Sequence, residues 1–249
     1  MSHLAAYVGP ARPIADALKA QTDAATQGAT GGGVVWWPAD EELPLRCVTS
    51  SDPAVDANLA SLAPRLSGQT IIASIRTPGK GKMPAAASPF ELDGVAGMHE
   101  GFMGRFREVT AARCIATLPE ELVGAIDVLD ESKAIFLLAI AARREDPDLS
   151  LADALVGAVG TAARICADAA AYCSLNVVLA RRDEIVGLRF ARGVEPTELW
   201  YRGTGETAPG LWLANSPMDD EDGWEVLPAD HLVRVTSEGA TVRPVRIER

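Results

Sequence analysis

The order of strand-like and helical segments constrains the fold of this chain more than any single motif does. Strand-like runs come first, two long helical segments at 131–144 and 150–172 follow, separated by Pro147, and further strand-like runs come after them. A doubly wound sheet needs strands and helices that alternate, so this order argues against that architecture. It predicts an α+β fold: a four-layer αββα sandwich of two mostly antiparallel sheets covered by helices.

Local composition gives the expected boundaries. Short runs rich in β-branched and aromatic residues predict strands at 33–37, 70–75, 94–99, 175–180, 184–190, 198–202, 211–214, 232–236 and 240–245. Helical periodicity predicts helices at 13–25, 56–66, 131–144 and 150–172. The Gly31-Gly32-Gly33 run is expected to form a turn before the first of these strands. Because neither an internal repeat nor a linker is visible, residues 1–249 are expected to form a single domain.

Hydropathy indicates a buried core and no membrane span. Hydrophobic residues make up 48% of the chain. The most apolar segments, at 134–142 and 151–171, are too short or too often interrupted by charged residues to cross a bilayer. The N-terminus lacks the basic region and sustained apolar block of a secretory signal. We therefore expect a soluble protein of the cytoplasm that does not bind membranes.

Charge and residue counts exclude several classes of function. The formal net charge of −11 repels phosphate backbones, so nucleic acid is not an expected partner. The four cysteines show no Cys-x-x-Cys spacing and the three histidines lie far apart, so neither a disulfide framework nor a metal site is expected. The glycine-rich stretches do not match the Gly-x-x-x-x-Gly-Lys-Ser/Thr frame of a phosphate loop. No cofactor is expected.

Several short segments carry a family resemblance through their order along the chain. They are Met1-Ser2-His3-Leu4, Ile75-Arg76-Thr77 and His99-Glu100-Gly101-Phe102, each at a strand end or the N-terminus, together with Ser88-Pro89-Phe90 and Ala214-Asn215-Ser216-Pro217-Met218, which precedes an acidic loop and Trp224. In this order the segments resemble the class II glutamine amidotransferases, which have the N-terminal nucleophile hydrolase fold. Among these, the chain is most similar to the stand-alone γ-glutamyl amidohydrolases of ergothioneine biosynthesis. The resemblance covers nearly the whole sequence.

The resemblance implies roles for Ser2 and Arg76. In the family, Met1 is removed and the new N-terminal cysteine attacks an amide while its own α-amino group acts as the base. Ser2 stands at this position, and since related hydrolases use serine, the change alone leaves activity open. Arg76 stands where the family has the arginine that binds the substrate α-carboxylate, a role that suits a guanidinium group. Without the resemblance, Ser2 is an ordinary terminal residue and Arg76 a surface arginine.

Glu100 is the main departure from the family pattern. The family has His-Asn-Gly where this chain has His99, Glu100 and Gly101, and its Asn side chain and Gly N–H form the oxyanion hole. A carboxylate cannot donate a hydrogen bond unless it is protonated, and the loss of one such donor costs roughly 100- to 1,000-fold in rate. Gly101 keeps its N–H, and His99 is counted with the substrate-binding residues. We expect Glu100 to form an ion pair with Arg76 that fills the former carboxylate site.

The family also has an aspartate that binds the substrate amino group. Either Asp130 or Glu131 matches it, and the sequence leaves the choice open. Independently of the resemblance, Asp130 is a favourable N-cap for the helix that follows, and Glu131 in the first turn is favoured by the helix dipole.

Three hypotheses for function follow. The favoured one is a non-catalytic protein with a degenerate site that binds a partner protein, such as a synthetase or another pathway enzyme, or a small amino-acid-like ligand. The alternative is an amidohydrolase acting on glutamine or a γ-glutamyl amide, with Ser2 as nucleophile and Gly101 and a protonated Glu100 as oxyanion donors. In the third, function lies on an unrelated surface. The Trp36-Trp37 pair hints at such a surface, because strand alternation turns one indole away from the core unless a helix covers it.

Overall fold

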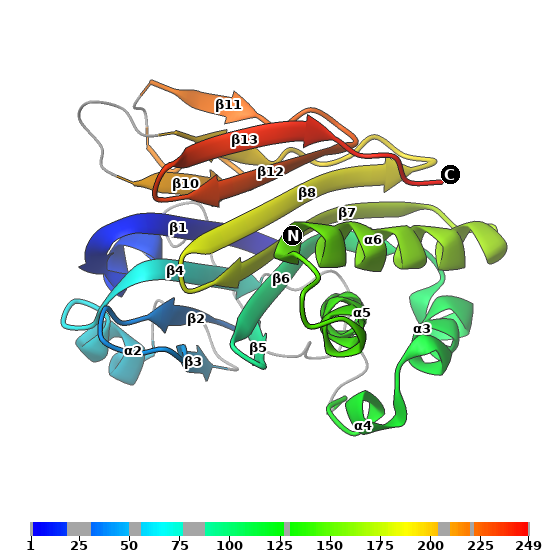
Figure 1. Ribbon diagram of the computed structural model, residues 1–249, viewed down its shortest axis with the longest axis horizontal. Coiled ribbons are helices and arrows are strands. Elements are labelled where there is room, and N and C mark those ends of the chain that lie inside the picture. Colours follow the sequence, from blue (N-terminus) through cyan, green and yellow to red (C-terminus); the bar gives the residue numbers. More distant parts are fainter. Residues whose placement is uncertain are drawn as a thin grey trace.

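The computed structural model describes residues 2–18, 31–49, 56–76, 88–126, 130–203, 210–219 and 222–248. Two antiparallel sheets lie face to face, and helices cover the outer face of each sheet (Figure 1). The α+β sandwich expected from the sequence is therefore confirmed.

The two sheets draw strands from both ends of the chain. In the described residues the first sheet has the order β11-β9-β10-β1-β4-β2-β3 and the second the order β13-β12-β8-β7-β6-β5. The first sheet consists of β1 (Ser2–Pro13), β2 (Gly31–Trp37), β3 (Leu45–Thr49), β4 (Ser67–Arg76), β9 (Trp200–Arg202), β10 (Leu211–Ala214) and β11 (Trp224–Val226). The second consists of β5 (Phe90–Leu92), β6 (Val95–Met103), β7 (Cys173–Arg181), β8 (Glu184–Arg192), β12 (His231–Thr236) and β13 (Gly239–Pro244).

The described helices are α2 (Ala57–Leu62), α3 (Ala111–Thr117), α4 (Glu120–Val123), α5 (Glu131–Glu145) and α6 (Leu151–Asp168), with a π-helical turn η1 (Phe106–Thr110) and a helical stretch at 14–18. Helices α2, α5 and α6 begin after residues whose side chains cap them, Asp56, Asp130 and Ser150. At the start of α6, Ser150 Oγ accepts from the Asp153 N–H at 3.1 Å and donates to the Asp153 carboxylate at 2.6 Å. This reciprocal pair satisfies an N–H group that the helix itself leaves without a partner.

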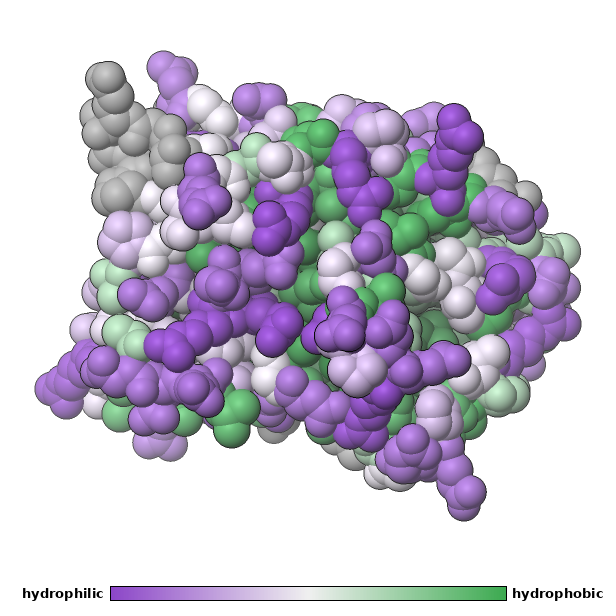
Figure 2. Space-filling view, viewed as in Figure 1, coloured by the Kyte–Doolittle hydropathy of each residue, from purple (hydrophilic) through white to green (hydrophobic). Residues whose placement is uncertain are grey.

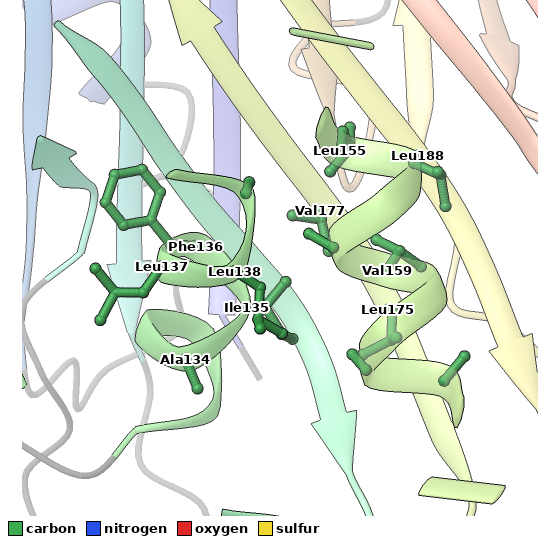
Figure 3. Close-up of a cluster of buried hydrophobic side chains, with 14 of the residues drawn as sticks. Ala134, Ile135, Phe136, Leu137, Leu138, Leu155, Val159, Leu175, Val177 and Leu188 are labelled. Carbon is green, nitrogen blue, oxygen red and sulfur yellow. The ribbon is translucent and has the colours of Figure 1, made fainter. Parts of the chain in front are cut away.

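Three apolar cores hold the four layers together. One lies between the two sheets, one between the first sheet and the helical residues 14–18 and α2, and one between the second sheet and helices α3 to α6. Figure 3 shows the last of these, where Phe136 of α5 packs beside Phe90 of β5 and Gly97 of β6, and Leu155 and Val159 of α6 lie over strands β7 and β8. Burial of these side chains fixes α5, and with it the residues at its N-terminus, against β6.

The strand β1 is the largest difference from the sequence-based expectation. The sequence predicted no strand before residue 33, yet Ser2–Pro13 pairs with β4 on one side and β10 on the other. This segment contains Ala, Gly and Pro, which have low strand propensity. It is also buried on both faces from residue 4 to residue 8, so it lacks the alternation by which a half-buried strand is recognised.

The glycine run and the tryptophan pair both belong to β2. The prediction of a turn at Gly31–Gly33 is wrong, because these residues pair with β4 as the start of the strand. A Cβ atom on Gly33 would lie 2.4 Å from the carbonyl oxygen of Cys47, so the close approach of β3 requires glycine there. Trp36 and Trp37 are only 5% and 1% exposed, in the outer and inter-sheet cores respectively. A covering helix therefore buries the outer indole, and the tryptophan pair does not form the exposed functional surface that the sequence suggested.

The remaining differences concern short elements. Strands β3, β5 and β11 and helices α3 and α4 were not predicted, and each has seven residues or fewer. The helix expected at 150–172 ends at Asp168. Of the helix expected at 13–25, residues 14–18 are helical, while 19–25 lie outside the described residues.

Polar side chains cover most of the face drawn in Figure 2, with apolar side chains visible between them. No helix in the described parts of the chain is both long enough and apolar enough to span a membrane.

Candidate functional site

The end of β4 brings Arg76 to the start of two other strands. β4 begins near the turn between β7 and β8, where Thr70 Oγ1 donates a hydrogen bond to the Arg182 carbonyl. From there β4 runs to Arg76, which is the register partner of Ser2 in β1 and of Gly31 in β2. Arg76 therefore lies at the end of the first sheet where β1 begins.

Strand β6 of the second sheet runs toward the same end. Ala96 lies near the β7–β8 turn, and Glu100, four residues further on, pairs with Asn176 of β7. Met98 packs into the core between the sheets, and alternation along the strand puts Glu100 on the same face. Glu100 thus faces the space between the sheets at the end where β4 terminates.

Arg76 forms an ion pair with Asp130 at the N-terminus of α5. Its Nη1 donates to one Asp130 carboxylate oxygen at 2.8 Å, its Nη2 lies 3.4 Å from the other, and Nη2 also donates to Ser132 Oγ at 2.9 Å. The two charged side chains are only 13% and 9% exposed. Ile72 of β4 packs between the sheets, so alternation puts Arg76 on the inward face as well.

Asp130 and Glu131 have different partners. Asp130 is the N-cap of α5, as the sequence predicted, and its Oδ1 accepts from the N–H groups of Ser132 and Lys133 at 2.9 and 3.2 Å. The Glu131 carboxylate instead accepts from the Met103 N–H at 3.0 Å, at the end of β6. Asp130 is therefore the acid that lies against Arg76, and Glu131 joins α5 to β6.

His99 extends the contacts of Arg76 toward β7. A guanidinium group only donates, so Ser132 Oγ accepts from Arg76 and can give its own hydrogen to His99 Nδ1, 3.1 Å away. This assigns the His99 proton to Nε2, which lies 3.4 Å from the Ser174 carbonyl oxygen. Burial lowers the pKa of His99 to about 4, against a smaller opposing effect of the hydrogen bond to Ser174. The imidazole is thus neutral near pH 7.

Glu100 is held from the side of the loop that follows β8. Thr197 Oγ1 donates to the Glu100 carboxylate at 2.7 Å. The Asn176 side-chain amide donates in turn to Thr197 Oγ1 at 2.9 Å and to the carbonyls of Thr197 and Glu198 at 3.2 and 3.0 Å. Glu100 is 8% exposed and Asn176 is fully buried.

The ion pair expected between Arg76 and Glu100 is wrong. In the described parts of the chain, the side-chain hydrogen bonds of Arg76 go to Asp130 and Ser132, and Glu100 accepts from Thr197. The reason is local: the N-cap position fixes the Asp130 carboxylate beside the guanidinium group, which therefore already has an anionic partner.

Gly101 has a backbone conformation that requires glycine. Its φ is +132°, and a Cβ atom would lie 2.0 Å from the Ser174 carbonyl oxygen. The segment after β10 approaches the same end, because Leu4 N donates to Asn215 Oδ1 at 3.0 Å. Met1, Thr77 and the Ser2 side chain lie outside the described residues.

No protein-family model matches the sequence. The chain is 28% identical over 192 residues to the γ-glutamyl-hercynylcysteine sulfoxide hydrolase of Mycolicibacterium smegmatis, a match that covers 76% of this chain and 70% of that protein. The structure of this chain is similar to that of a glutamine aminotransferase class-II domain protein from Silicibacter pomeroyi, with a TM-score of 0.77 and 19% identity. The match covers 99% of this chain and 100% of that one. The chain has the fold of the class II glutamine amidotransferases.

Two further structures support this amidotransferase fold. A predicted glutamine amidotransferase from Pseudomonas aeruginosa matches with a TM-score of 0.60 and 14% identity, covering 97% of this chain and all of that one. The glutamine phosphoribosylpyrophosphate amidotransferase of B. subtilis matches with a TM-score of 0.65 and 11% identity, over 99% of this chain and 50% of that one. The resemblance read from the order of the short segments is therefore confirmed.

Sequence reasoning missed three residues of this site in the amidotransferase fold. Ser132 links Arg76 to His99, while Thr197 and Asn176 hold Glu100. No spacing rule identifies Ser132, because residues two positions apart in a helix do not face each other. Asn176 is a polar residue within an otherwise apolar strand segment, and such residues are hydrogen-bonded when buried. Within the described residues, no group of three His, Cys, Asp or Glu side chains could hold a metal ion.

Proposed function

We propose that this chain binds an α-amino acid, or a compound that contains one such as a γ-glutamyl amide, without hydrolysing it. The observation that carries the proposal is the Arg76–Asp130 pair at the sheet end where β1 begins. The guanidinium group matches an α-carboxylate and the aspartate matches an α-ammonium group, so a zwitterion that lies beside the pair would face an opposite charge at each end.

Two features support recognition of this kind. Asp130 is fixed at the N-cap of α5 and Arg76 is held by Ser132, so neither side chain needs to be ordered when a ligand arrives. The Mycolicibacterium smegmatis relative is named as a hydrolase of a γ-glutamyl compound, and a γ-glutamyl group carries a free α-carboxylate and α-amino group.

Glu100 argues against hydrolysis at this site. In the family, its position supplies an oxyanion donor, and removal of one such donor costs roughly 100- to 1,000-fold in rate. An ionised carboxylate at ~4 Å from a developing oxyanion adds about 4 kcal/mol of repulsion at an effective dielectric constant of 20. Thr197 holds the carboxylate in place. A protein that binds a ligand without turning it over acts through another molecule. The proposal therefore includes a partner protein, such as a synthetase or another pathway enzyme, that recognises the ligand-bound form.

Titration calorimetry on the full chain with glutamine, glutamate and a γ-glutamyl dipeptide tests the proposal. We expect binding that Arg76→Lys weakens at least tenfold, because an ammonium group cannot form the bidentate contact. Arg113, which is exposed on α3, gives the matched control Arg113→Lys. Ammonia and amine release measured on the same samples should stay at the buffer rate. Absence of binding to all amino acids tested would refute the proposal.

The second candidate is an amidohydrolase with Ser2 as nucleophile. One observation favours it: the β1–β4 register pairs Ser2 with Arg76, the residue expected to bind the substrate α-carboxylate. This reading needs Met1 to be removed, so that the Ser2 α-amino group can act as the base. Mass spectrometry of the natural N-terminus tests that step, and a retained Met1 would eliminate the candidate. Amide hydrolysis that disappears in Ser2→Ala would instead establish it over the non-catalytic proposal.

A further inference from the structure

Hydrogen-bond acceptors gather at the position where the family has an oxyanion hole. The Glu100 carboxylate and the Asn176 side chain are register partners on the inward faces of β6 and β7. In the described parts of the chain, Thr197 makes the one side-chain hydrogen bond to Glu100, and no cationic side chain forms an ion pair with it.

The Asn176 side-chain oxygen lacks a donor among the described residues, although it is fully buried. Its orientation is well determined, because the amide nitrogen faces three oxygens, those of Thr197 O, Thr197 Oγ1 and Glu198 O. A flipped amide would set its oxygen against those acceptors, so the unpartnered atom is the oxygen. Nearly all buried polar atoms in proteins have a partner, and those that do not call for an explanation.

Both acceptors require a hydrogen-bond donor. A buried carboxylate is stabilised by a cation or a strong donor, and an amide oxygen by any N–H or O–H group. An oxygen-rich group such as a carboxylate or an oxyanion meets repulsion there. The hydrogen bond to Glu100 lies near the protein surface, because Thr197 is itself an exposed residue. The site therefore selects ligand groups that donate hydrogen bonds.

We infer that the ligand is a diamino acid, whose α-amino acid end lies at Arg76 and Asp130 and whose terminal ammonium group lies at Glu100. This inference rests on the proposed function, which supplies the first of these two anchors. Arg76 and Glu100 stand on the inward faces of opposing sheets at the same end of the sandwich, and packed sheets lie about 10 Å apart. A bound α-amino acid can therefore extend its side chain from the first sheet toward the second.

The inference predicts an order of affinity. Diamino acids place an ammonium group at Glu100 and bind most tightly. Glutamine, which can turn its amide N–H groups to the carboxylate, follows, and glutamate, which brings a second carboxylate, binds most weakly. The length of the best diamino acid reports the distance between the two anchors.

Calorimetric titration of the full chain with 2,4-diaminobutyrate, ornithine, lysine, glutamine and glutamate is the test. We expect the best diamino acid to bind at least tenfold more tightly than glutamine. Glu100→Gln should remove this preference and strengthen glutamate binding, whereas Glu120→Gln, at an exposed position in α4, should change neither. If Glu100→Gln does not fold, as judged by circular dichroism, the order of affinities in the unmodified protein decides the matter alone.

The two proposals fail in different ways. If glutamine and glutamate bind as tightly as the diamino acids, the inference about the terminal group is refuted while the proposed binding of an α-amino acid stands. If no amino acid binds to the unmodified protein or to Glu100→Gln, the proposed function is refuted, and the inference with it.

Discussion

The candidate site has two halves that differ in how many of their charged and hydrogen-bonding groups have partners among the described residues. In the Arg76 half (Arg76, Asp130, Ser132 and His99), each charge faces an opposite charge and the donors and acceptors form a continuous chain to the Ser174 carbonyl. In the Glu100 half (Glu100, Thr197 and Asn176), a carboxylate faces a neutral hydroxyl group and a buried amide oxygen has no donor among the described residues. The first half is ordered by the scaffold, and the second is left open to a group from outside the chain.

Asp130→Ala should have the largest effect, because it breaks the self-contained half at two points. The substitution removes the N-cap of α5 and leaves the mostly buried Arg76 without its carboxylate. The free energy of unfolding should fall by about 4 kcal/mol, measured by urea denaturation. Asp130→Asn keeps a capping oxygen and should cost roughly half as much. Equal losses in the two variants would show that the ion pair alone matters and that the cap contributes nothing.

Acidification should weaken the same half through His99. The pKa of His99 is about 4 in the folded protein, below its ordinary value of 6.5, so the unfolded chain takes up the proton first. The free energy of unfolding should therefore fall as the pH falls from about 6.5 to about 4, by about 3 kcal/mol in total. Urea denaturation at pH 7 and at pH 4.5 measures this. His99→Gln should flatten the profile in this window, while His231→Gln, a surface substitution, should not. A profile unchanged by His99→Gln would contradict the assignment.

Gly101→Ala tests the junction between the halves, since Gly101 follows His99 and Glu100 in β6. Its positive φ and the contact with the Ser174 carbonyl oxygen should make the substitution cost roughly 2 kcal/mol of unfolding free energy. Gly157 is the matched control: it lies within α6, and a Cβ atom there meets nothing within 4 Å. Gly157→Ala should stabilise the protein by about 1 kcal/mol. If the melting temperatures of both variants shift in the same direction, the claim that the backbone at Gly101 requires glycine is refuted.

Thr197→Val should have the smallest effect on stability, because the Glu100 half depends least on its internal contacts. It removes the hydroxyl group that donates to Glu100 and should cost about 1 kcal/mol, measured by urea denaturation. Thr197→Ser keeps the hydroxyl group and should be close to neutral. A loss as large as that of Asp130→Ala would show that both halves are equally built into the fold.

The sequence predicted the fold where its signals were local and repeated. Helices α5 and α6 carry long apolar faces and capping residues, and strands β7 and β8 are rich in β-branched residues, so their existence and order were visible. The central strand β1 was not visible, because burial on both faces removes alternation and because its partners lie far away in the sequence.

The candidate site was predictable only as far as the family resemblance reached. Segment order identified Arg76, Glu100 and Gly101, and capping preference identified Asp130 as an N-cap. Which acid faces Arg76 was not predictable, because it depends on the angle at which α5 meets β4. Nor was the role of Thr197, which reaches Glu100 from a position 97 residues later in the chain. Sequence spacing carries no information about contacts of this kind.

The position of β1 between β4 and β10 has a consequence for biosynthesis. Leu4 and Asn215 bond to each other although 211 positions separate them. As the ribosome releases the chain, β1 can pair with β4 early, but its other edge stays open until β10 has emerged. An unpaired strand edge is a template for aggregation, and contacts this distant in sequence form slowly. The strand that begins beside Arg76 is therefore made long before its second edge is paired, so a nascent chain stalled before β10 would be a natural client for chaperones.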